Sequence, residues 1–219
     1  IYNLLRMKFN LVIKKNEKKS AFKDLYEGIK YLKTQKFILI IMLIVSFTSM
    51  FGLSLITLFP AWAVKILHGN AATNGLLQTF RGIGAVICSL IIASFSRYIV
   101  RGKVLSFGMI SLPALMILFS FNRTFFISAF LLILIGAAFI AINNLSNGLT
   151  QTIVTEEFRG RVMGVYSFSF FALMPVGSLL IGTLAEHFGS PMAIFVNGLI
   201  LLLLFGSILI SYPLITKVE

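Results

Sequence analysis

The chain has 219 residues, of which 58% are hydrophobic and only 12% charged, and its formal net charge is +12. Soluble domains carry roughly a quarter charged residues, so this composition excludes an ordinary soluble domain and indicates an integral membrane protein. The basic residues gather beside a long apolar run and lack an aromatic-interleaved module, so we expect no nucleic-acid partner. The single cysteine, Cys88, excludes an intrachain disulfide.

The first 36 residues form a polar arm rich in lysine. It begins at Ile1 and lacks the pattern of a signal peptide, so we expect the chain to be a fragment with something missing upstream. Ser20 is placed to cap a short amphipathic helix that would lie along the inner membrane surface. Its apolar residues recur at helical spacing and are Phe22, Leu25, Tyr26, Ile29 and Leu32. A flexible basic linker is the alternative.

Six apolar segments follow the arm, approximately residues 37–66, 73–95, 104–121, 125–154, 162–187 and 191–215. A helix rises about 1.5 Å per residue, so about 20 apolar residues cross the hydrocarbon core. Only helices and closed barrels satisfy the backbone in lipid, and barrel strands would alternate polar and apolar residues. The sequence therefore predicts an all-α membrane protein with a bundle of six transmembrane helices.

The basic residues between the segments predict the orientation. If the arm is inside, the inside holds the ten basic residues of the arm together with Arg97, Arg101, Lys103, Arg159, Arg161 and Lys217. The outside then holds only Lys65 and Arg123. Cytoplasmic loops carry the excess of Lys and Arg, so we expect both ends of the chain to be cytoplasmic.

A weak internal similarity appears when the chain is shifted by 89 residues. The shift places residues 89–94, SLIIAS, on residues 178–183, SLLIGT, and Gly75 on Gly164. It matches the second segment to the fifth, which would cross the membrane in opposite directions. This is expected for an inverted repeat of three plus three helices, although apolar low complexity gives the same result by chance.

Arg81 lies within the second segment. It forms a polar and small-residue stripe with Asn74, Gln78, Ala85 and Cys88, which we expect to face protein or a water-filled cavity. The sequence has no acidic residue between positions 27 and 156. The partner of Arg81 is therefore substrate, a backbone carbonyl or a carboxylate outside this chain. Snorkelling to the outer headgroups is the alternative.

The fourth and fifth segments carry further candidates. Four amides share one side of the fourth segment near its inner end, namely Asn143, Asn144, Asn147 and Gln151. They suit a polar substrate group, or hydrogen bonds between helices. In the fifth segment, Pro175 and Gly177 precede a small-xxx-small face, which suits a helix that bends, or ordinary tight packing. The third and sixth segments are less polar, so we expect them to face lipid while the other four surround a cavity.

No enzyme motif, metal-ligand cluster or cofactor motif occurs, so we expect no catalytic residues, no metal and no cofactor. Four stretches instead carry a resemblance: residues 25–32 (LYEGIKYL), 82–85 (GIGA), 151–164 (QTIVTEEFRGRVMG) and 175–182 (PVGSLLIG). With them the chain resembles the C-terminal half of a major facilitator superfamily transporter, nearest to bacterial enterobactin exporters and macrolide efflux proteins.

The resemblance implies that the six segments are helices seven to twelve and that the arm is the central cytoplasmic loop. It assigns conformational roles to two loop motifs, Arg97, Arg101, Gly102 and Lys103 in one, and Arg159, Gly160 and Arg161 in the other. Ser96 stands where the family often has an acid, which puts a charge lock there in doubt. Arg159 and Arg161 are then expected to meet Glu156, Glu157 or lipid headgroups.

The function implied is export of a small amphipathic compound, such as a drug or siderophore, by proton antiport in a bacterial inner membrane. Alternating access would require a missing N-terminal six-helix half. Because arginine stays protonated and no carboxylate lies within the spans, the coupling acid would belong to that half. The alternatives are a nonfunctional partial membrane protein, or the membrane domain of an ATP-driven exporter, which the short inner loops disfavour.

Overall fold

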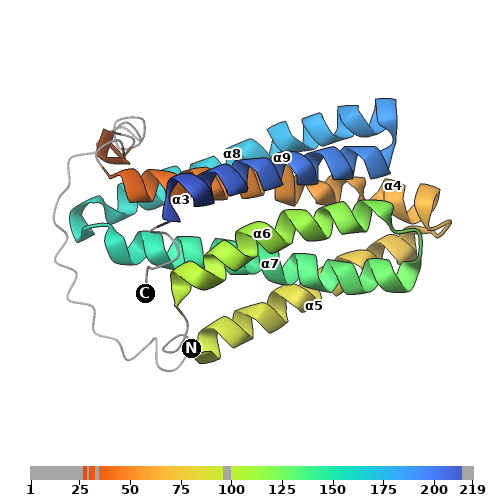
Figure 1. The fold of residues 1–219 in the computed structure, drawn as a ribbon, viewed down its shortest axis with the longest axis horizontal. Coiled ribbons are helices and arrows are strands. Elements are labelled where there is room, and N and C mark those ends of the chain that lie inside the picture. Colours follow the sequence, from red (N-terminus) through yellow and green to blue (C-terminus); the bar gives the residue numbers. More distant parts are fainter. Residues whose placement is uncertain (1–26, 29, 33–34, 96–99, 214–219) are drawn as a thin grey trace, which may run out of the picture.

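A computed structural model describes residues 27–28, 30–32, 35–95 and 100–213, and these form a bundle of six long helical spans (Figure 1). Span one consists of five consecutive segments: α3 (Lys36–Phe47), η1 (Thr48–Gly52), η2 (Leu53–Leu58), α4 (Phe59–Ala61) and η3 (Trp62–Ile66). The other spans are α5 (Ala71–Phe95), α6 (Arg101–Phe121), α7 (Phe125–Ile153), α8 (Glu156–Phe188) and α9 (Ser190–Ser211). All six are long and apolar enough to cross a membrane, which confirms the predicted fold class.

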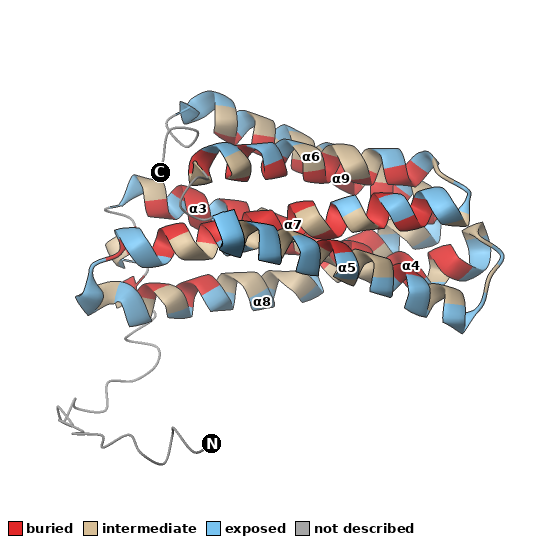
Figure 2. Ribbon diagram, turned by 90° about the horizontal axis from the view of Figure 1, so that it is seen from below, coloured by how far each residue is buried: buried red, intermediate tan, exposed pale blue. Residues whose placement is uncertain are grey.

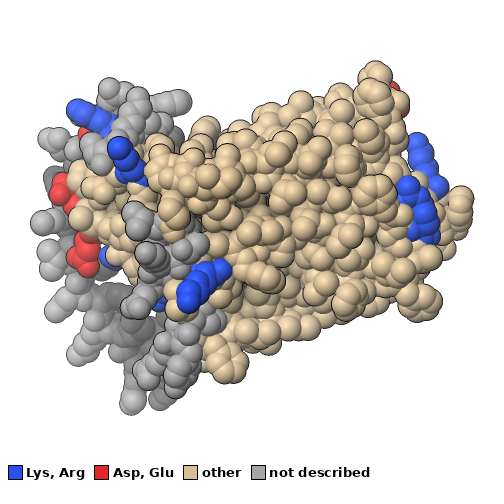
Figure 3. All heavy atoms as spheres, in the orientation of Figure 1, with Lys and Arg blue, Asp and Glu red and all other residues tan. Residues whose placement is uncertain are grey.

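The spans run back and forth between two ends of the bundle. We call one the arm end, where residues 27–28, 30–32 and 35 lie and where α6 and α8 begin. The other is the far end, which holds residues 67–70, 122–124 and 189. Charged side chains gather at both ends and leave an uncharged band between them (Figure 3). This distribution is the one that a bilayer requires, since an exposed charge at mid-depth costs several kcal/mol.

Parts of two predicted inner loops are helical. Residues 155–161 were expected to be a loop, but α8 begins at Glu156, and the backbone amides of Phe158 and Arg159 donate to the carbonyl of Thr155. Thr155 in extended conformation and two glutamates in the first turn favour this start, because negative charge stabilises a helix N-terminus. Likewise α6 begins at Arg101, three residues before the predicted start.

Contacts of the two central spans correspond between the two halves of the chain, although α8 packs on α9 while α5 makes little contact with α6. Span one contacts α8 and α9, and α7 contacts α5 and α6 in the same way. Span one and α7 are also the most buried spans, with buried positions along both (Figure 2), and they run in opposite directions along the bundle (Figure 1). The packing therefore follows the three-plus-three inverted arrangement that the sequence similarity predicted.

Three glycines let helix backbones meet directly. A Cβ atom on Gly84 of α5 would overlap the carbonyl oxygen of Ile133 in α7, and one on Gly136 would overlap the carbonyl of Arg81. In the other half, a Cβ on Gly177 of α8 would overlap the carbonyl of Met50 in η1. Small residues drive helix association in membranes because they allow such close van der Waals contact.

Span one is irregular at mid-depth, which the sequence analysis did not predict. It passes from α-helix into a π-helical segment and then a 3₁₀ segment before Pro60. Neighbouring spans supply hydrogen-bond partners there, since Asn197 of α9 donates to the hydroxyl of Ser54 at 3.2 Å and to the carbonyl of Phe51 at 3.4 Å. Such π-helical insertions are frequent at functional sites.

The glycine contacts predict a difference between two glycine-to-alanine variants. Gly84→Ala should lower the thermal unfolding midpoint of the purified full-length protein, because overpacking costs about 1–3 kcal/mol. Gly206→Ala is the control, since no side-chain or neighbouring-helix atom lies within 4 Å of the added methyl, and it should leave the midpoint unchanged or raised. Equal midpoints for both variants would contradict the close approach at Gly84.

Candidate functional site

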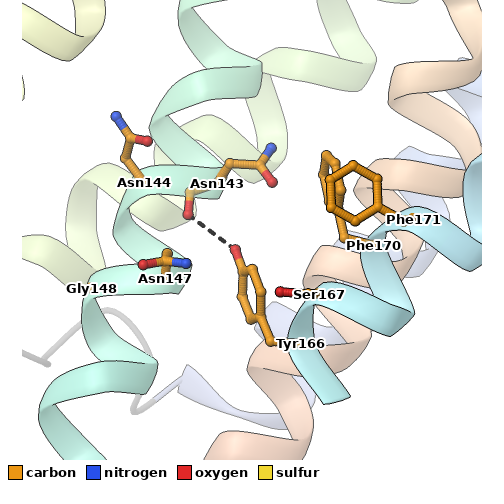
Figure 4. A pocket seen from close by; sticks show the side chains of 8 residues that line it. All are labelled: Asn143, Asn144, Asn147, Gly148, Tyr166, Ser167, Phe170 and Phe171. Carbon is orange, nitrogen blue, oxygen red and sulfur yellow. Dashed lines mark hydrogen bonds between the residues drawn. The ribbon is translucent and has the colours of Figure 1, made fainter. Parts of the chain in front are cut away.

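A cavity of about 390 Å³ lies between α7 and α8, in the half of the bundle nearer the arm end. Its lining residues are Asn143, Asn144, Asn147 and Gly148 of α7 and Tyr166, Ser167, Phe170 and Phe171 of α8 (Figure 4). Amides therefore line one wall, and aromatic rings with one hydroxyl group line the other. A few polar groups on a partly apolar surface are typical of small-molecule sites.

Hydrogen bonds fix several of these side chains. The Tyr166 hydroxyl crosses the cavity and donates to the backbone carbonyl of Asn143 at 3.2 Å, and it also bonds to the Asn147 side chain. Asn143 Nδ2 donates to the carbonyl of Phe139 at 2.9 Å, while Asn147 Oδ1 accepts from Gln151 Nε2 at 2.5 Å. The amide wall is consequently ordered before any ligand binds, and Gln151 orients Asn147 from outside the lining.

Asn144 has a different role from its neighbours. Its Nδ2 donates to Ser89 Oγ of α5 at 3.4 Å, so its side chain turns away from Tyr166 toward another helix (Figure 4). Of the four predicted amides, Asn143, Asn144 and Asn147 line the cavity, and Gln151 supports Asn147 from outside it. Asn144 forms the hydrogen bond between helices that was the alternative interpretation, and a substrate-binding role remains a prediction for Asn143 and Asn147.

The aromatic wall is held against the irregular part of span one. The Ser49 hydroxyl of η1 donates to the backbone carbonyl of Phe170, and Thr57 Oγ1 donates to Ser178 Oγ at 3.0 Å. Between these contacts, Pro175 lacks an amide hydrogen for the helix ladder of α8, and Gly177 touches η1. Pro175 and Gly177 thus mark the place where α8 packs on the least regular backbone of the bundle.

Gln78 and Arg81 do not line this cavity. Gln78 is exposed on α5, and Arg81 is half-buried where its backbone touches Gly136 of α7. Within the described residues, the buried Nε of Arg81 has no hydrogen-bond partner. Gly136 precedes Asn143 by seven residues, so Arg81 lies about 10 Å nearer the far end than the cavity wall. The structure thus separates the predicted site residues into two levels.

The aromatic residues of the site were not singled out in the sequence. Tyr166, Phe170 and Phe171 recur at helical spacing beside Ser167, but an aromatic stripe in an apolar span is ordinary packing until its neighbours are known. Only the juxtaposition with the amides of α7 distinguishes them. Tyr166 was the one residue that could have indicated this wall from the sequence, because a buried tyrosine hydroxyl needs a hydrogen-bond partner inside the span.

Residues of the arm dock on the first turns of α8. Glu27 Oε2 lies 3.2 Å from Arg161 Nη2, and the Tyr31 ring stacks on Phe158 with centroids 4.5 Å apart. Gly28 fits against Val165, next to the cavity residue Tyr166. Residues 27–28 and 30–32 are helical and lie against α8, and the predicted helix along the membrane surface stays a prediction because its cap at Ser20 lies outside the described residues.

The remaining motif residues that the structure describes lie at the arm end. Gly102 is buried in the first turn of α6, with Arg101 half-buried and Lys103 exposed on either side. Arg97 lies outside the described residues. Arg159 and Gly160 are exposed on α8. Arg161 was expected to meet a neighbouring glutamate or lipid, and its observed partner is Glu27 of the arm.

Comparison with known proteins identifies the family. The profile of the transmembrane secretion effector family, a branch of the major facilitator superfamily (MFS), matches residues 1–218. The chain belongs to this family. It is also 26% identical over 192 residues to the uncharacterized MFS-type transporter YfmI of Bacillus subtilis (strain 168). That match covers 85% of the chain and 47% of the relative, so the chain spans about half the length of the curated MFS protein it matches.

MFS membership agrees with the chemistry of the cavity, whose amide and aromatic groups bind rather than react. Within the described residues, no three His, Cys, Asp or Glu side chains lie close enough together to hold a metal ion. The lining is suited to hydrogen bonding and stacking. The site is therefore a candidate for substrate binding in an MFS transporter.

The arm contact predicts a charge-reversal effect. In the full-length protein, Glu27→Arg or Arg161→Glu should speed chymotrypsin cleavage after Tyr31 by about two- to fivefold, because a half-shielded ion pair contributes about 0.5–1 kcal/mol. The double reversal should restore the slow rate. Arg159→Glu, an exposed change on the same helix, is the control. Rates that do not differ between single and double variants would refute the docking of the arm.

Proposed function

We propose that this chain is the C-terminal half of a secondary active MFS exporter of small amphipathic compounds. The observation that carries the proposal is the cavity of about 390 Å³ between α7 and α8, with amides on one wall and aromatic rings on the other. Amides suit the polar groups of a substrate, and aromatic faces suit its apolar part. Drug-like and siderophore-like molecules both combine these features.

A second six-helix half is proposed from the exposed helices. Only 11% of the most apolar stretch of α5, and the same share of α8, is buried, whereas the value for span one is 61%. These two helices flank the cavity region and would be the natural surface for an N-terminal half. The twofold length of the matched relative supports this interpretation. The cavity between α7 and α8 would then face the N-terminal half and open alternately to each side of the membrane.

The orientation follows from the charges. In the described residues the arm end carries Lys30, Lys36, Arg101, Lys103, Arg159 and Arg161, and the far end carries Lys65 and Arg123. The excess of Lys and Arg marks the cytoplasmic side. We therefore assign the arm end to the cytoplasm of a bacterial cell, with the bundle in the plasma membrane.

Coupling to a proton gradient requires a titratable group within the bilayer. The acidic residues of the sequence nearest the spans are Glu156, Glu157 and Glu186, and all three lie at the ends of α8. Arg81 remains charged at physiological pH and cannot cycle protons. We propose that the proton-carrying acid belongs to the N-terminal half and that Arg81 is its electrostatic partner or that of an anionic substrate.

Transport by the full-length protein tests these proposals. Cells producing it should accumulate less of at least one compound in a panel of macrolides, amphipathic dyes and catecholate siderophores, and a protonophore should abolish the difference. Asn147→Leu should cut efflux by about tenfold or more, because a buried polar partner is left without its hydrogen bond. Arg81→Gln should abolish efflux at near-normal membrane abundance.

The control is Ser207→Leu, an exposed change on α9 away from the cavity, which should transport normally. Normal efflux by Asn147→Leu would remove the cavity from the transport path. Normal efflux by Arg81→Gln would reduce Arg81 to a residue that extends to the outer headgroups. Insensitivity to the protonophore would overturn proton antiport.

A further inference from the structure

A second concave surface lies on the other side of α7, between α5 and α6. It is an apolar cleft of about 460 Å³ that shares no lining residue with the candidate site. Its lining comes from α6 (Val104, Phe107, Gly108, Ser111, Ala114, Leu115, Leu118), from α7 (Leu134, Ala137, Ala138, Ala141) and from Cys88 of α5. The polar cavity and this cleft thus have different chemistry.

The cleft exists because α5 and α6 do not pack against each other. In one half of the bundle α8 packs against α9, but the corresponding helices α5 and α6 make little contact. They diverge toward the arm end on either side of α7 (Figure 1). The floor is built of small side chains such as Ala137 and Ala141, so an opening remains at membrane depth. The side chains of Phe107 and Leu118 on its edge are 72% and 58% exposed.

One end of the cleft is positively charged. Arg101 precedes the lining residue Val104 by three positions, and Lys103 precedes Phe107 by four. Both basic residues therefore lie at the arm end of the cleft, on the side of α6 that lines it. Within the described residues, no carboxylate forms an ion pair with either side chain. The cleft therefore presents two cations at the level of the headgroups and an apolar channel beneath them.

The dimensions fit a lipid chain. From Val104 to Leu118 the lining of α6 extends about 21 Å by helical rise, which exceeds the roughly 15 Å thickness of one hydrocarbon leaflet. A chain that entered beside Arg101 would thus have apolar walls over its whole length in that leaflet. An unoccupied opening of this size in a bilayer would lose dispersion contacts on every wall.

We infer that the cleft binds one anionic phospholipid of the arm-end leaflet, with an acyl chain between α5 and α6 and its phosphate at Arg101 and Lys103. The anionic class follows from the two basic side chains, since each Lys or Arg near the surface contributes about 1 kcal/mol toward an anionic headgroup. The bound lipid replaces the helix contact that α8 and α9 make in the other half. This site is independent of the transported substrate.

Native mass spectrometry of the purified full-length protein tests the inference. The probes are palmitoyl-oleoyl phosphatidylglycerol and the zwitterionic phosphatidylcholine with the same chains. The protein should retain phosphatidylglycerol in preference, and each of Arg101→Gln and Lys103→Gln should reduce that preference about fivefold. Arg159→Gln, which removes an exposed cation at the same end, is the matched control. Ala137→Phe fills the floor and should reduce retention of both lipids.

Each other outcome overturns the site. Equal retention of the two lipids, or a preference that Arg159→Gln reduces as much as Lys103→Gln, would mean general attraction of anionic lipid to a basic surface. Retention unchanged in Ala137→Phe would show that no chain enters the cleft. Ser111→Leu, a smaller filling change at the opposite wall, serves where Ala137→Phe fails to fold, and unchanged retention there has the same meaning.

Discussion

The closest approach of helix backbones governs the architecture of this bundle. Where Gly84 meets the carbonyl of Ile133 and Gly177 meets the carbonyl of Met50, no side chain separates the helices. In a bilayer, where lipid tails are as apolar as the helices, such contacts replace the hydrophobic driving force of a soluble core. They fix α5 on α7 and α8 on span one, and they leave the outer sides of α5 and α8 exposed.

The candidate site depends on that arrangement. Because Gly177 and Ser49 hold α8 against the irregular segment η1, the aromatic wall is positioned opposite the amides of α7. The arm contacts the beginning of the same helix through Glu27 and Arg161. One end of the aromatic wall is therefore attached to the described arm residues and the other to the irregular backbone of span one. In the alternating-access cycle that we propose, a movement of either element would alter the width of the cavity.

The sequence was sufficient to predict the six spans, because an apolar segment of bilayer length can satisfy its backbone in lipid almost only as a helix. It was less informative at the boundaries: the Arg159–Arg161 segment read as a loop because its charges interrupt the apolar run, although Thr155 and two glutamates start a helix there. Nothing local predicted the π and 3₁₀ segments of span one, where Ser54 bonds to Asn197 of α9 and Ser49 bonds to α8. The aromatic wall could not be predicted either, because only its position opposite the amides of α7 distinguishes it from ordinary packing.

The central proposal is that the cavity between α7 and α8 is a substrate site that water can reach from the arm end, which we assign to the cytoplasm. In the full-length protein carrying Cys88→Ser, a cysteine introduced by Asn147→Cys should react with a membrane-impermeant maleimide in inside-out vesicles. A cysteine introduced by Leu203→Cys, on the exposed side of α9, should remain unreacted because it faces lipid. Failure of Asn147→Cys to react faster than Leu203→Cys in folded protein would contradict the account.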